Sequence, residues 1–384
     1  MKRLVTVILF TLTSVACASP GGSQTTARPS LASQTATPAP SPTQASAKAL
    51  IIVPSPDGKK TLVEDFTDPV HPVSVYTVAM ALRNARFISA TEIGYTTTNQ
   101  PDSPIDGATT IWRMNLDDMQ PHSVATLQGD AIALAWNPDG SSIAFIAYTG
   151  PLGENRLWLK SGSSEPRTIT PLIPVSGREY ISTDQITVAF SPDGKFLLMV
   201  DTIVTGDGSD VSATFQIRQT SDGRLLWVPP SARKANAYGT SMAVWSHLSD
   251  RLYYADPDAV GGKTGIHVWE PFDKVSILAG VTGWTSPSLS PDDRFVAYEV
   301  DGTDGKPHIT VRDLQSETVR LVTQVAGQPI MLSDSELLER HFVRQIDGAP
   351  GPPYIADRYF ALNLTTNAET PMPAGFEPMD IWPH

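Results

Sequence analysis

The sequence predicts an all-β domain made of repeated four-stranded antiparallel units. The first observation is a recurring segment in which a tight turn on Pro-Asp-Gly or Pro-Asp-Asp separates two strand-forming stretches. The second is that another hairpin follows each such segment, which gives strands A, B, C and D in every unit. The third is that residues 50–384 contain no long amphipathic helical pattern. Repeats of several strands at a period of roughly 40–55 residues are typical of a β-propeller.

The repeated turn has a physical basis. Pro fixes φ at the first corner, Asp caps the turn, and Gly accepts a positive φ. We therefore interpret the motif aspartates as turn caps and not as catalytic residues. An ordinary β-sandwich is the alternative, but it has no reason to repeat this turn chemistry. The clear copies are IIVPSPDGKKTLV from Ile51, AWNPDGSSIAFIA from Ala135, AFSPDGKFLLMV from Ala189 and SLSPDDRFVAYEV from Ser288, and the weaker copies are RFISATEIGYT, VWSHLSDRLYYAD and IMLSDSELLERHFV. The turn markers are Asp57, Thr91, Asp139, Asp193, Asp250, Asp292 and Asp334, spaced by 34, 48, 54, 57, 42 and 42 residues.

The number of blades follows from the two ends of the repeat region. Six units are clear from near Ala79 onwards, and Ala49–Met80 holds one more marker turn but is short of a full blade. The chain ends with a strand-like segment, EPMDIW. A ring must protect its edge strands, and pairing the two termini in one blade does so. We predict seven blades with one shared between the termini, with six blades as the alternative.

The turn motif resembles the propeller repeats of the TolB family, which are related to WD repeats. The resemblance rests on Trp136–Gly140, Phe190–Gly194 and Leu289–Asp293, and it covers most of residues 79–343. It implies the propeller fold. It implies little about function, because such repeats occur in binding modules, in peptidase partner domains and in envelope proteins.

The N-terminus is typical of an exported lipoprotein. Lys2 and Arg3 precede an apolar run that is too short to span a bilayer comfortably, so residues 1–16 are predicted to be a signal peptide. The single cysteine, Cys17, follows in SVAC, which resembles a bacterial lipobox and implies lipidation at Cys17. Ser14 stands where Leu is usual, and the alternative is cleavage near Ala18 without a lipid.

Residues 17–48 form the second predicted region, a disordered tether rich in Ser, Thr, Pro and Ala. Residues 49–384 are the predicted propeller. A lipid, a tether and a globular domain together predict a protein that is anchored at the bacterial cell membrane or envelope, with its domain outside the cytoplasm. The membrane contact is expected through the lipid alone, and the protein is expected to be a monomer.

Charge and motifs exclude several functions. The net charge is −12 and no basic run follows the signal, which argues against nucleic-acid binding. Neither Gly-x-Ser-x-Gly nor His-Glu-x-x-His occurs, and the seven histidines are scattered singly. No catalytic residue, cofactor or metal site is therefore predicted. Two Asp/Gly-rich loops, Asp201–Asp210 and Asp301–Asp304, leave Ca²⁺ as a weaker alternative because they lack EF-hand spacing.

The predicted B-to-C loops are long and all emerge at one end of the ring, which we call the long-loop face. These six loops carry 12 Asp or Glu and four Lys or Arg, a net charge of −8. Loops on a rigid scaffold often carry function, although turns prefer Asp for local reasons as well. We expect non-enzymatic binding of a protein or envelope ligand here; the alternative is a hydrolase or lyase acting on saccharide or peptide at the central channel. The loops are Thr96–Thr109, Tyr148–Arg156, Asp201–Ala213, Asp256–Gly265, Asp301–Pro307 and Arg344–Asp357, and the candidate binding residues are Asp130, Gln185, Asp207, Asp210, Trp284, Asp301 and Asp304.

Overall fold

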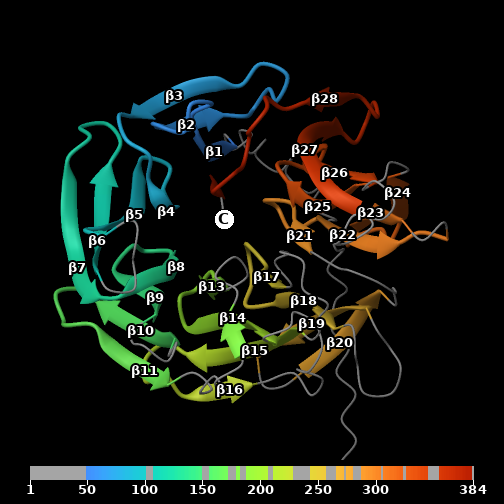
Figure 1. Cartoon of the computed structure of the whole chain (residues 1–384). Helices are drawn as coiled ribbons and strands as arrows, with labels where there is room; N and C mark the ends of the chain where they lie inside the picture. Colours follow the sequence, from blue (N-terminus) through green and yellow to red (C-terminus); the bar gives the residue numbers. More distant parts are fainter. Residues whose placement is uncertain are drawn as a thin grey trace, which may run out of the picture. The chain divides into compact units, whose positions relative to one another are not determined.

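The domain is a ring of seven antiparallel sheets, as the computed structural model shows (Figure 1). The structure describes residues 49–100, 107–148, 155–171, 179–181, 187–205, 211–227, 243–256, 265–271, 274–279, 287–303, 306–322, 326–344 and 354–382. Within these ranges every regular element is a strand, and no helix has the length and apolar character that a membrane span requires. The prediction of a seven-bladed, all-β propeller is confirmed, and the six-bladed alternative is wrong.

The sheets follow one another along the chain, and each blade is a meander of neighbouring strands. Their orders are β4-β5-β6-β7, β8-β9-β10-β11, β13-β14-β15-β16 with β12 also on β14, β17-β18-β19-β20, β21-β22-β23-β24, β25-β26-β27-β28 and β29-β1-β2-β3. We number these blades 1 to 7 in that order. The strands are β1 (Leu50–Pro54), β2 (Thr61–Asp65), β3 (Val73–Val78), β4 (Arg83–Ser89), β5 (Glu92–Thr98), β6 (Ala108–Asn115), β7 (Pro121–Gln128), β8 (Asp130–Trp136), β9 (Ser142–Tyr148), β10 (Asn155–Ser161), β11 (Arg167–Pro171), β12 (Glu179–Ile181), β13 (Thr187–Phe190), β14 (Phe196–Thr205), β15 (Val211–Gln219), β16 (Leu225–Trp227), β17 (Ala243–Trp245), β18 (Leu252–Asp256), β19 (Gly265–Glu270), β20 (Lys274–Ala279), β21 (Ser288–Leu289), β22 (Phe295–Asp301), β23 (Pro307–Asp313), β24 (Val319–Val322), β25 (Ala326–Met331), β26 (Glu336–Arg344), β27 (Tyr354–Asn363), β28 (Glu369–Pro371) and β29 (Asp380–Trp382).

All seven turn markers lie where the repeat predicted them, in the turn between the first two chain-consecutive strands of a blade. The glycine of the motif has a positive φ in three of these turns, at Gly58, Gly140 and Gly194, with φ between 66° and 70°. Asp293 takes the same conformation at φ 58° in the fourth clear copy. A side chain with a Cβ disfavours this region, which explains why Gly dominates the position.

The two ends of the described domain meet in blade 7. β29 pairs antiparallel with β1 through Leu50–Trp382, Ile51–Ile381 and Ile52–Asp380. The innermost strand of this blade therefore comes from the C-terminal end and the other three come from the N-terminal end (Figure 1). The shared blade predicted from EPMDIW is confirmed.

The core is divided among the seven gaps between neighbouring blades. Each gap holds one cluster of buried apolar side chains. Strand β14 shows how one strand serves two gaps: Leu197 and Met199 pack against blade 2, whereas Leu198 packs against blade 4. This alternation follows from the period of two residues in a strand. At Gly94 a Cβ would lie 2.0 Å from the Trp136 ring of the next blade, so only glycine permits that contact.

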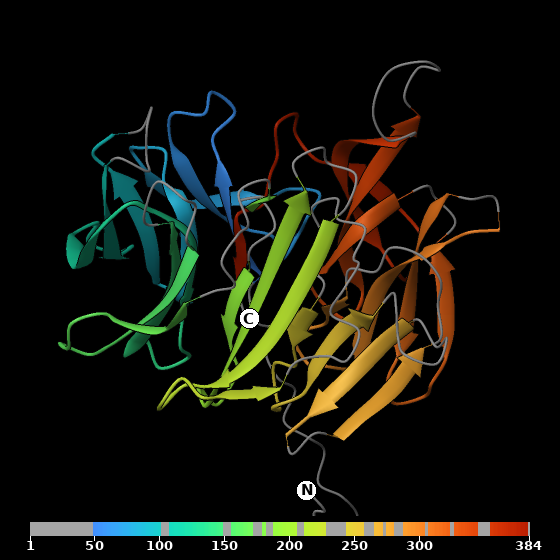
Figure 2. The ribbon, with the colours of Figure 1, turned by 60° about the horizontal axis from the view of Figure 1, so that its bottom comes forward.

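Several of the predicted long loops are shorter than expected, including Thr96–Thr109, whose residues 96–98 and 108–109 belong to β5 and β6. Residues 201–205 and 211–213 of the loop predicted at Asp201–Ala213 extend β14 and β15, which pair as far as Val204 and Val211. This long pair stands out in Figure 2. β12 joins it through Ile181–Ile203, which adds a fifth strand to blade 3. Residues 354–357 of the loop predicted at Arg344–Asp357 likewise belong to β27.

Candidate functional site

Two described residues at the long-loop face form an ion pair that joins the innermost strands of neighbouring blades. Asp130 is the first residue of β8 and Arg83 is the first residue of β4. Their side chains meet with Arg83 Nη2 3.3 Å from Asp130 Oδ2. The first strand of a blade starts at the end where its second strand stops, so both residues lie at the long-loop face. The Asp130 side chain is 13% exposed and that of Arg83 is 44% exposed, which leaves the cation as the more accessible partner.

The second carboxylate oxygen of Asp130 has no hydrogen-bond partner. Asp130 Oδ1 is buried and accepts no hydrogen bond. Asn84, the residue after Arg83, already donates a hydrogen bond from its Nδ2 to the Ala131 carbonyl at 2.7 Å, which links β4 to β8. A buried acceptor without a partner costs free energy. Asp130 is therefore a candidate acceptor at this face for a hydrogen-bond donor that can reach the buried oxygen.

Of the other predicted binding residues, only Asp301 lies in the described part of the chain. Asp301 is the last residue of β22, where it pairs with Pro307. The end of the second strand and the start of the first strand lie at the same end of a blade, so Asp301 belongs to the same face as Asp130. Gln185, Asp207, Asp210, Trp284 and Asp304 lie outside the described residues, and so does Cys17.

The opposite end of the ring carries the marker turns, and four of the marker aspartates there accept hydrogen bonds within their own turns. Asp193 Oδ1 accepts hydrogen bonds from the Ser191 hydroxyl at 2.8 Å and from the Lys195 backbone N–H at 2.9 Å. Burial alone would raise the pKa of Asp193, but the hydrogen bonds from Lys195 and Ser191 outweigh it and bring that pKa to about 2. The predicted role of these residues as turn caps is confirmed, with the same backbone contact at Asp57, Asp139 and Asp292.

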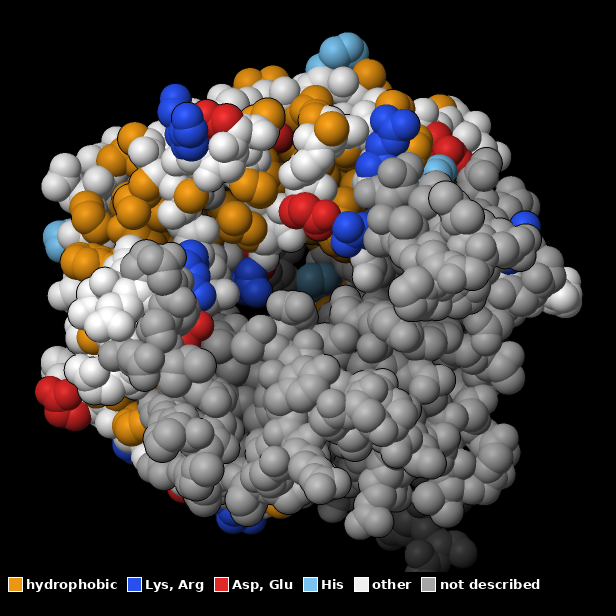
Figure 3. All heavy atoms as spheres, viewed as in Figure 1, with side chains coloured by type: hydrophobic (Ala, Val, Ile, Leu, Met, Phe, Trp, Pro, Cys, Tyr) orange, Lys and Arg blue, Asp and Glu red, His pale blue; other side chains and the backbone are white. Residues whose placement is uncertain are grey.

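The centre of the ring is hollowed. Figure 3 shows a dark opening there, and where its rim is described, basic, acidic and histidine side chains lie beside it together with apolar ones. The innermost strands β4, β8, β13, β17, β21, β25 and β29 surround this opening (Figure 1). The charged side chains of the described rim could contact a polar ligand or a charged partner.

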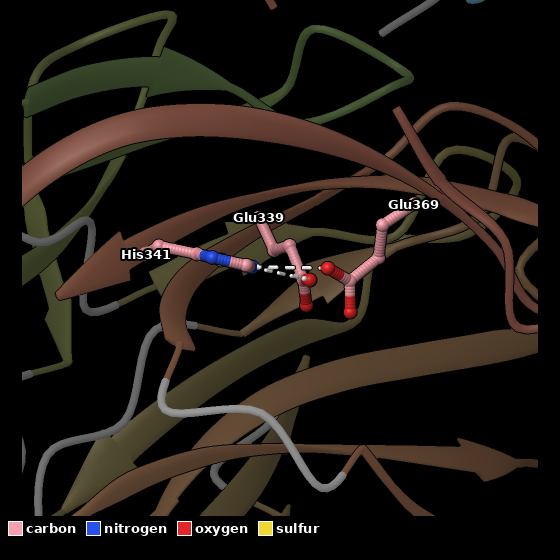
Figure 4. Close-up of side chains that lie close together, drawn as sticks. All are labelled: Glu339, His341 and Glu369. Atoms are coloured by element: carbon pink, nitrogen blue, oxygen red, sulfur yellow. Dashed lines mark hydrogen bonds and ion pairs between the residues drawn. The ribbon is translucent and has the colours of Figure 1, made fainter. Parts of the chain in front are cut away.

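A cluster that the sequence did not predict lies on blade 6. Glu339 Oε1 is 3.0 Å from His341 Nε2, and Glu369 Oε2 is 3.8 Å from the same nitrogen. One side-chain nitrogen or oxygen from each of the three residues lies within 4.8 Å of the other two. Figure 4 shows the imidazole and both carboxylates pointing toward one another. The Glu339 side chain is 0% exposed and its Oε2 has no hydrogen-bond partner.

The elements explain how these three side chains meet. Glu339 and His341 are two residues apart on β26, a spacing that places both on one face of a strand. Glu369 comes from β28, two strands away across β27. The His341 ring is stacked on Phe360 of β27, with centroids 3.8 Å apart, which fixes its orientation. The only signal in the sequence was the Glu-x-His spacing within a strand; the partner Glu369 could be found only from the strand register.

Comparisons with known proteins identify the fold alone. No protein-family model matches the sequence, and no curated protein matches it. Solved propellers do resemble it, including a prolyl endopeptidase with a TM-score of 0.50 and 14% identity, covering 83% of this chain and 45% of that chain. TolB from Acinetobacter baumannii is also similar, with a TM-score of 0.41 and 14% identity over 72% of this chain and 64% of that chain.

The β-propeller domain of the Trilobed protease from Pyrococcus furiosus is a third similar structure, with a TM-score of 0.46 and 14% identity over 78% of this chain and 94% of that chain. TolB structures are thus among the similar proteins, as the repeat motif predicted. This chain spans 64% of the TolB structure and less than half of the endopeptidase structure.

Proposed function

We propose that this protein is a lipid-anchored bacterial envelope protein whose propeller binds a basic protein or a cationic envelope ligand at the long-loop face. The observation that carries the proposal is the contrast between the two ends of the ring. At the marker turns the motif aspartates are bound to their own backbone, whereas Asp130 at the long-loop face keeps one buried oxygen without a partner. The acidic excess of the loops, a net charge of −8 in the sequence, would add a long-range attraction.

The binding experiment uses charge neutralisation. Asp207, Asp210, Asp301 and Asp304 are changed together to Asn in the full-length chain, and partners are captured and then quantified at low and high salt. We expect the parent to bind its partner faster at low salt, because exposed charges are screened within about 8–10 Å at physiological ionic strength. The variant should lose most of that salt dependence.

A matched control carries the same charge change at the opposite end. Asp118→Asn, Glu165→Gln, Asp222→Asn and Glu317→Gln alter four exposed side chains in the turns between the third and fourth strands. This control should bind like the parent at both salt concentrations. If the long-loop variant folds and binds like the parent, the acidic residues serve solubility and local turn formation only.

The anchor is tested separately. Cys17→Ser should move the protein from the membrane fraction to the soluble fraction, because the lipid would be its sole attachment. Lipoproteins of this pattern carry several acyl chains, which suits firm attachment where a single chain is marginal. Membrane retention of the Cys17→Ser protein would contradict the lipid anchor and leave the binding proposal untouched.

The alternative from the sequence was a hydrolase or lyase at the central channel, and peptidases are among the proteins with this fold. Among the described residues, the His–carboxylate cluster lies on β26 and β28 and not on the innermost strands. No specific arrangement in the described part of the channel favours catalysis, and the binding role is the one we propose.

A further inference from the structure

We propose that Glu339, His341 and Glu369 form a binding site for a divalent transition-metal ion, for which Zn²⁺ is the best match. The site offers one imidazole nitrogen and two carboxylate oxygens. Zn²⁺ is bound in proteins by this kind of mixed nitrogen and oxygen set. Ca²⁺ and Mg²⁺ prefer oxygen ligands alone, so the histidine argues against them.

The distances suit a metal ion with small movements of the side chains. With metal–ligand bonds of about 2.0–2.2 Å, ligand atoms around a tetrahedral ion lie roughly 3.4 Å apart. Here Nε2 of His341 is 3.0 Å from Glu339 Oε1 and 3.8 Å from Glu369 Oε2. These separations bracket the required value, and the three atoms face a common point in Figure 4.

The burial of Glu339 is the independent observation that points to a ligand. Its side chain is 0% exposed, and its Oε2 accepts no hydrogen bond although its Oε1 faces His341. A buried carboxylate is costly unless it is paired or coordinates a metal. Glu369 brings a second acidic group to the same place. A divalent cation supplies two positive charges against these two carboxylates and offers the unpartnered oxygen a second contact.

The surroundings hold the ligands in place and leave access. Stacking on Phe360 orients the His341 ring so that Nε2 faces the carboxylates. The His341 and Glu369 side chains are 20% and 24% exposed, so an ion can reach the site from solvent. Three protein ligands leave a fourth position for water or for a group from a partner, as in open zinc sites.

The test measures metal binding by the purified, untagged full-length chain after treatment with a chelator. Zn²⁺ is titrated in competition with a chromophoric indicator, and Co²⁺ is added separately to read its visible spectrum. We expect one equivalent of Zn²⁺ per chain, a Co²⁺ spectrum of nitrogen and oxygen coordination, and an increase in Tm with Zn²⁺ because the ion binds the folded state. Ca²⁺ and Mg²⁺ should produce no comparable increase in Tm.

The variants decide whether these residues are the ligands. Glu369→Gln and His341→Gln should each weaken Zn²⁺ binding by at least about tenfold, the lower bound for disturbing the supporting groups of a metal site. The matched control is His71→Gln, because His71 pairs with Asp68 at 3.0 Å but both side chains are well exposed. This control should bind Zn²⁺ like the parent.

A substitution of the buried Glu339 carries the greatest risk of unfolding the protein. In that case Glu369→Gln, which lies on the outermost strand of the blade, tests the proposal. The proposal is overturned if the folded parent binds no equivalent of Zn²⁺, or if Glu369→Gln and His341→Gln bind it as tightly as the parent. Loss of binding in His71→Gln alone would also overturn it.

Discussion

The Ser191 hydroxyl donates a hydrogen bond to Asp193 at 2.8 Å, and its own oxygen accepts one from the Phe196 backbone N–H at 3.0 Å. This pair closes the turn between β13 and β14 from both sides. The same arrangement recurs in Ser55–Asp57 and Ser290–Asp292. Because every bond lies within six consecutive residues, the turn is specified locally, and the repetition of Ser-Pro-Asp in the sequence is a repetition of this chemistry.

Replacing Asp193 by Ala should lower the free energy of unfolding by about 0.5–2 kcal/mol, by analogy with the loss of a helix-capping side chain. The change removes the acceptor for both Ser191 and the Lys195 backbone N–H. Urea denaturation of the parent and the variant measures the difference. Asp193→Asn keeps an acceptor oxygen and serves as the control, with a smaller loss expected.

Ligand binding by Asp193→Ala should persist below the shifted Tm, because the turn lies at the opposite end from the long-loop face. If stability is unchanged while binding is lost, Asp193 belongs to a site and is not a turn cap.

Replacing Asp293 by Gly should destabilise the contact between blades 4 and 5. Its carboxylate accepts hydrogen bonds from the backbone N–H groups of His247 at 2.8 Å and Leu248 at 3.0 Å, and from the Ser246 hydroxyl. Glycine would relieve the positive φ at a gain of about 1 kcal/mol. A hydrogen bond to a charged group contributes about 1.5–3 kcal/mol. Even one of the three therefore outweighs the relieved strain, and the net destabilisation should be at least about 0.5 kcal/mol.

Thermal denaturation of Asp293→Gly checks this balance, with Asp293→Asn as the control that keeps the side-chain acceptor. A Gly variant as stable as the parent, or more stable, would show that backbone strain outweighs the contact between the blades.

The sequence allowed all seven marker turns to be predicted because their hydrogen bonds are local. It did not allow features that depend on strand register to be predicted. The stretch after Asp201 has the composition of a loop, yet residues 201–205 are strand because they pair with residues of β15 and β12. Glu369 likewise reaches His341 only across β27. These two features therefore depend on pairing between strands that are distant in the sequence, and the local sequence pattern does not specify them.

The contact between Asp292 and Asp334 is another feature of this kind, and it predicts a pH dependence. Burial and the hydrogen bond with Asp292 raise the pKa of Asp334 to about 6. Burial also acts to raise the pKa of Asp292, but hydrogen bonds with Asp334 and Ser290 outweigh it and lower that pKa. Below about pH 6 the Asp334 carboxyl is therefore expected to be protonated and to donate to Asp292, which links the marker turns of blades 5 and 6.

The directions of the two pKa shifts determine how the stability of the protein changes with pH. The contribution of Asp334 is complete below its ordinary pKa of 3.8 and is lost as the pH rises through about 6. The contribution of Asp292 is present above its ordinary value and is lost as the pH falls below it. Stability from this pair should therefore be greatest at about pH 4, and it should fall as the pH rises from there to about 6.

Asp334→Asn should reduce the fall in stability between pH 4 and pH 7.5, because the amide can donate to Asp292 at both values. The effect should be about 1 kcal/mol or less, since the groups are substantially exposed and screened by solvent. Urea midpoints at the two pH values measure it. Asp139→Asn is the control and should keep the parent's pH dependence, because Asp139 has its hydrogen bonds within its own turn. An unchanged dependence in Asp334→Asn would rule out the hydrogen bond from protonated Asp334 to Asp292.

The short strand β29 closes the ring by pairing with β1, and a substitution of Trp382 tests how much this strand contributes to stability. Trp382 lies opposite Leu50 on β1, and its ring is 6.3 Å from that of Phe87 on β4. The Asp380 carboxylate accepts a hydrogen bond from the Phe87 backbone N–H at 2.6 Å. Truncation of a fully buried Trp to Ala costs about 3–5 kcal/mol. Trp382 is only partly buried, so Trp382→Ala should cost about 1–3 kcal/mol on the same basis.

The location of the effect separates closure from general packing. Hydrogen exchange should increase in β1 and β4 of Trp382→Ala, because both strands contact β29. The matched control is Trp158→Ala: this ring is also partly buried, and it stacks on Phe145 within blade 2, 6.3 Å away. Faster exchange in that variant should stay near blade 2. If both variants loosen the whole ring equally, β29 has no special role in closure, and the seven blades unfold as one cooperative unit wherever an aromatic contact is removed.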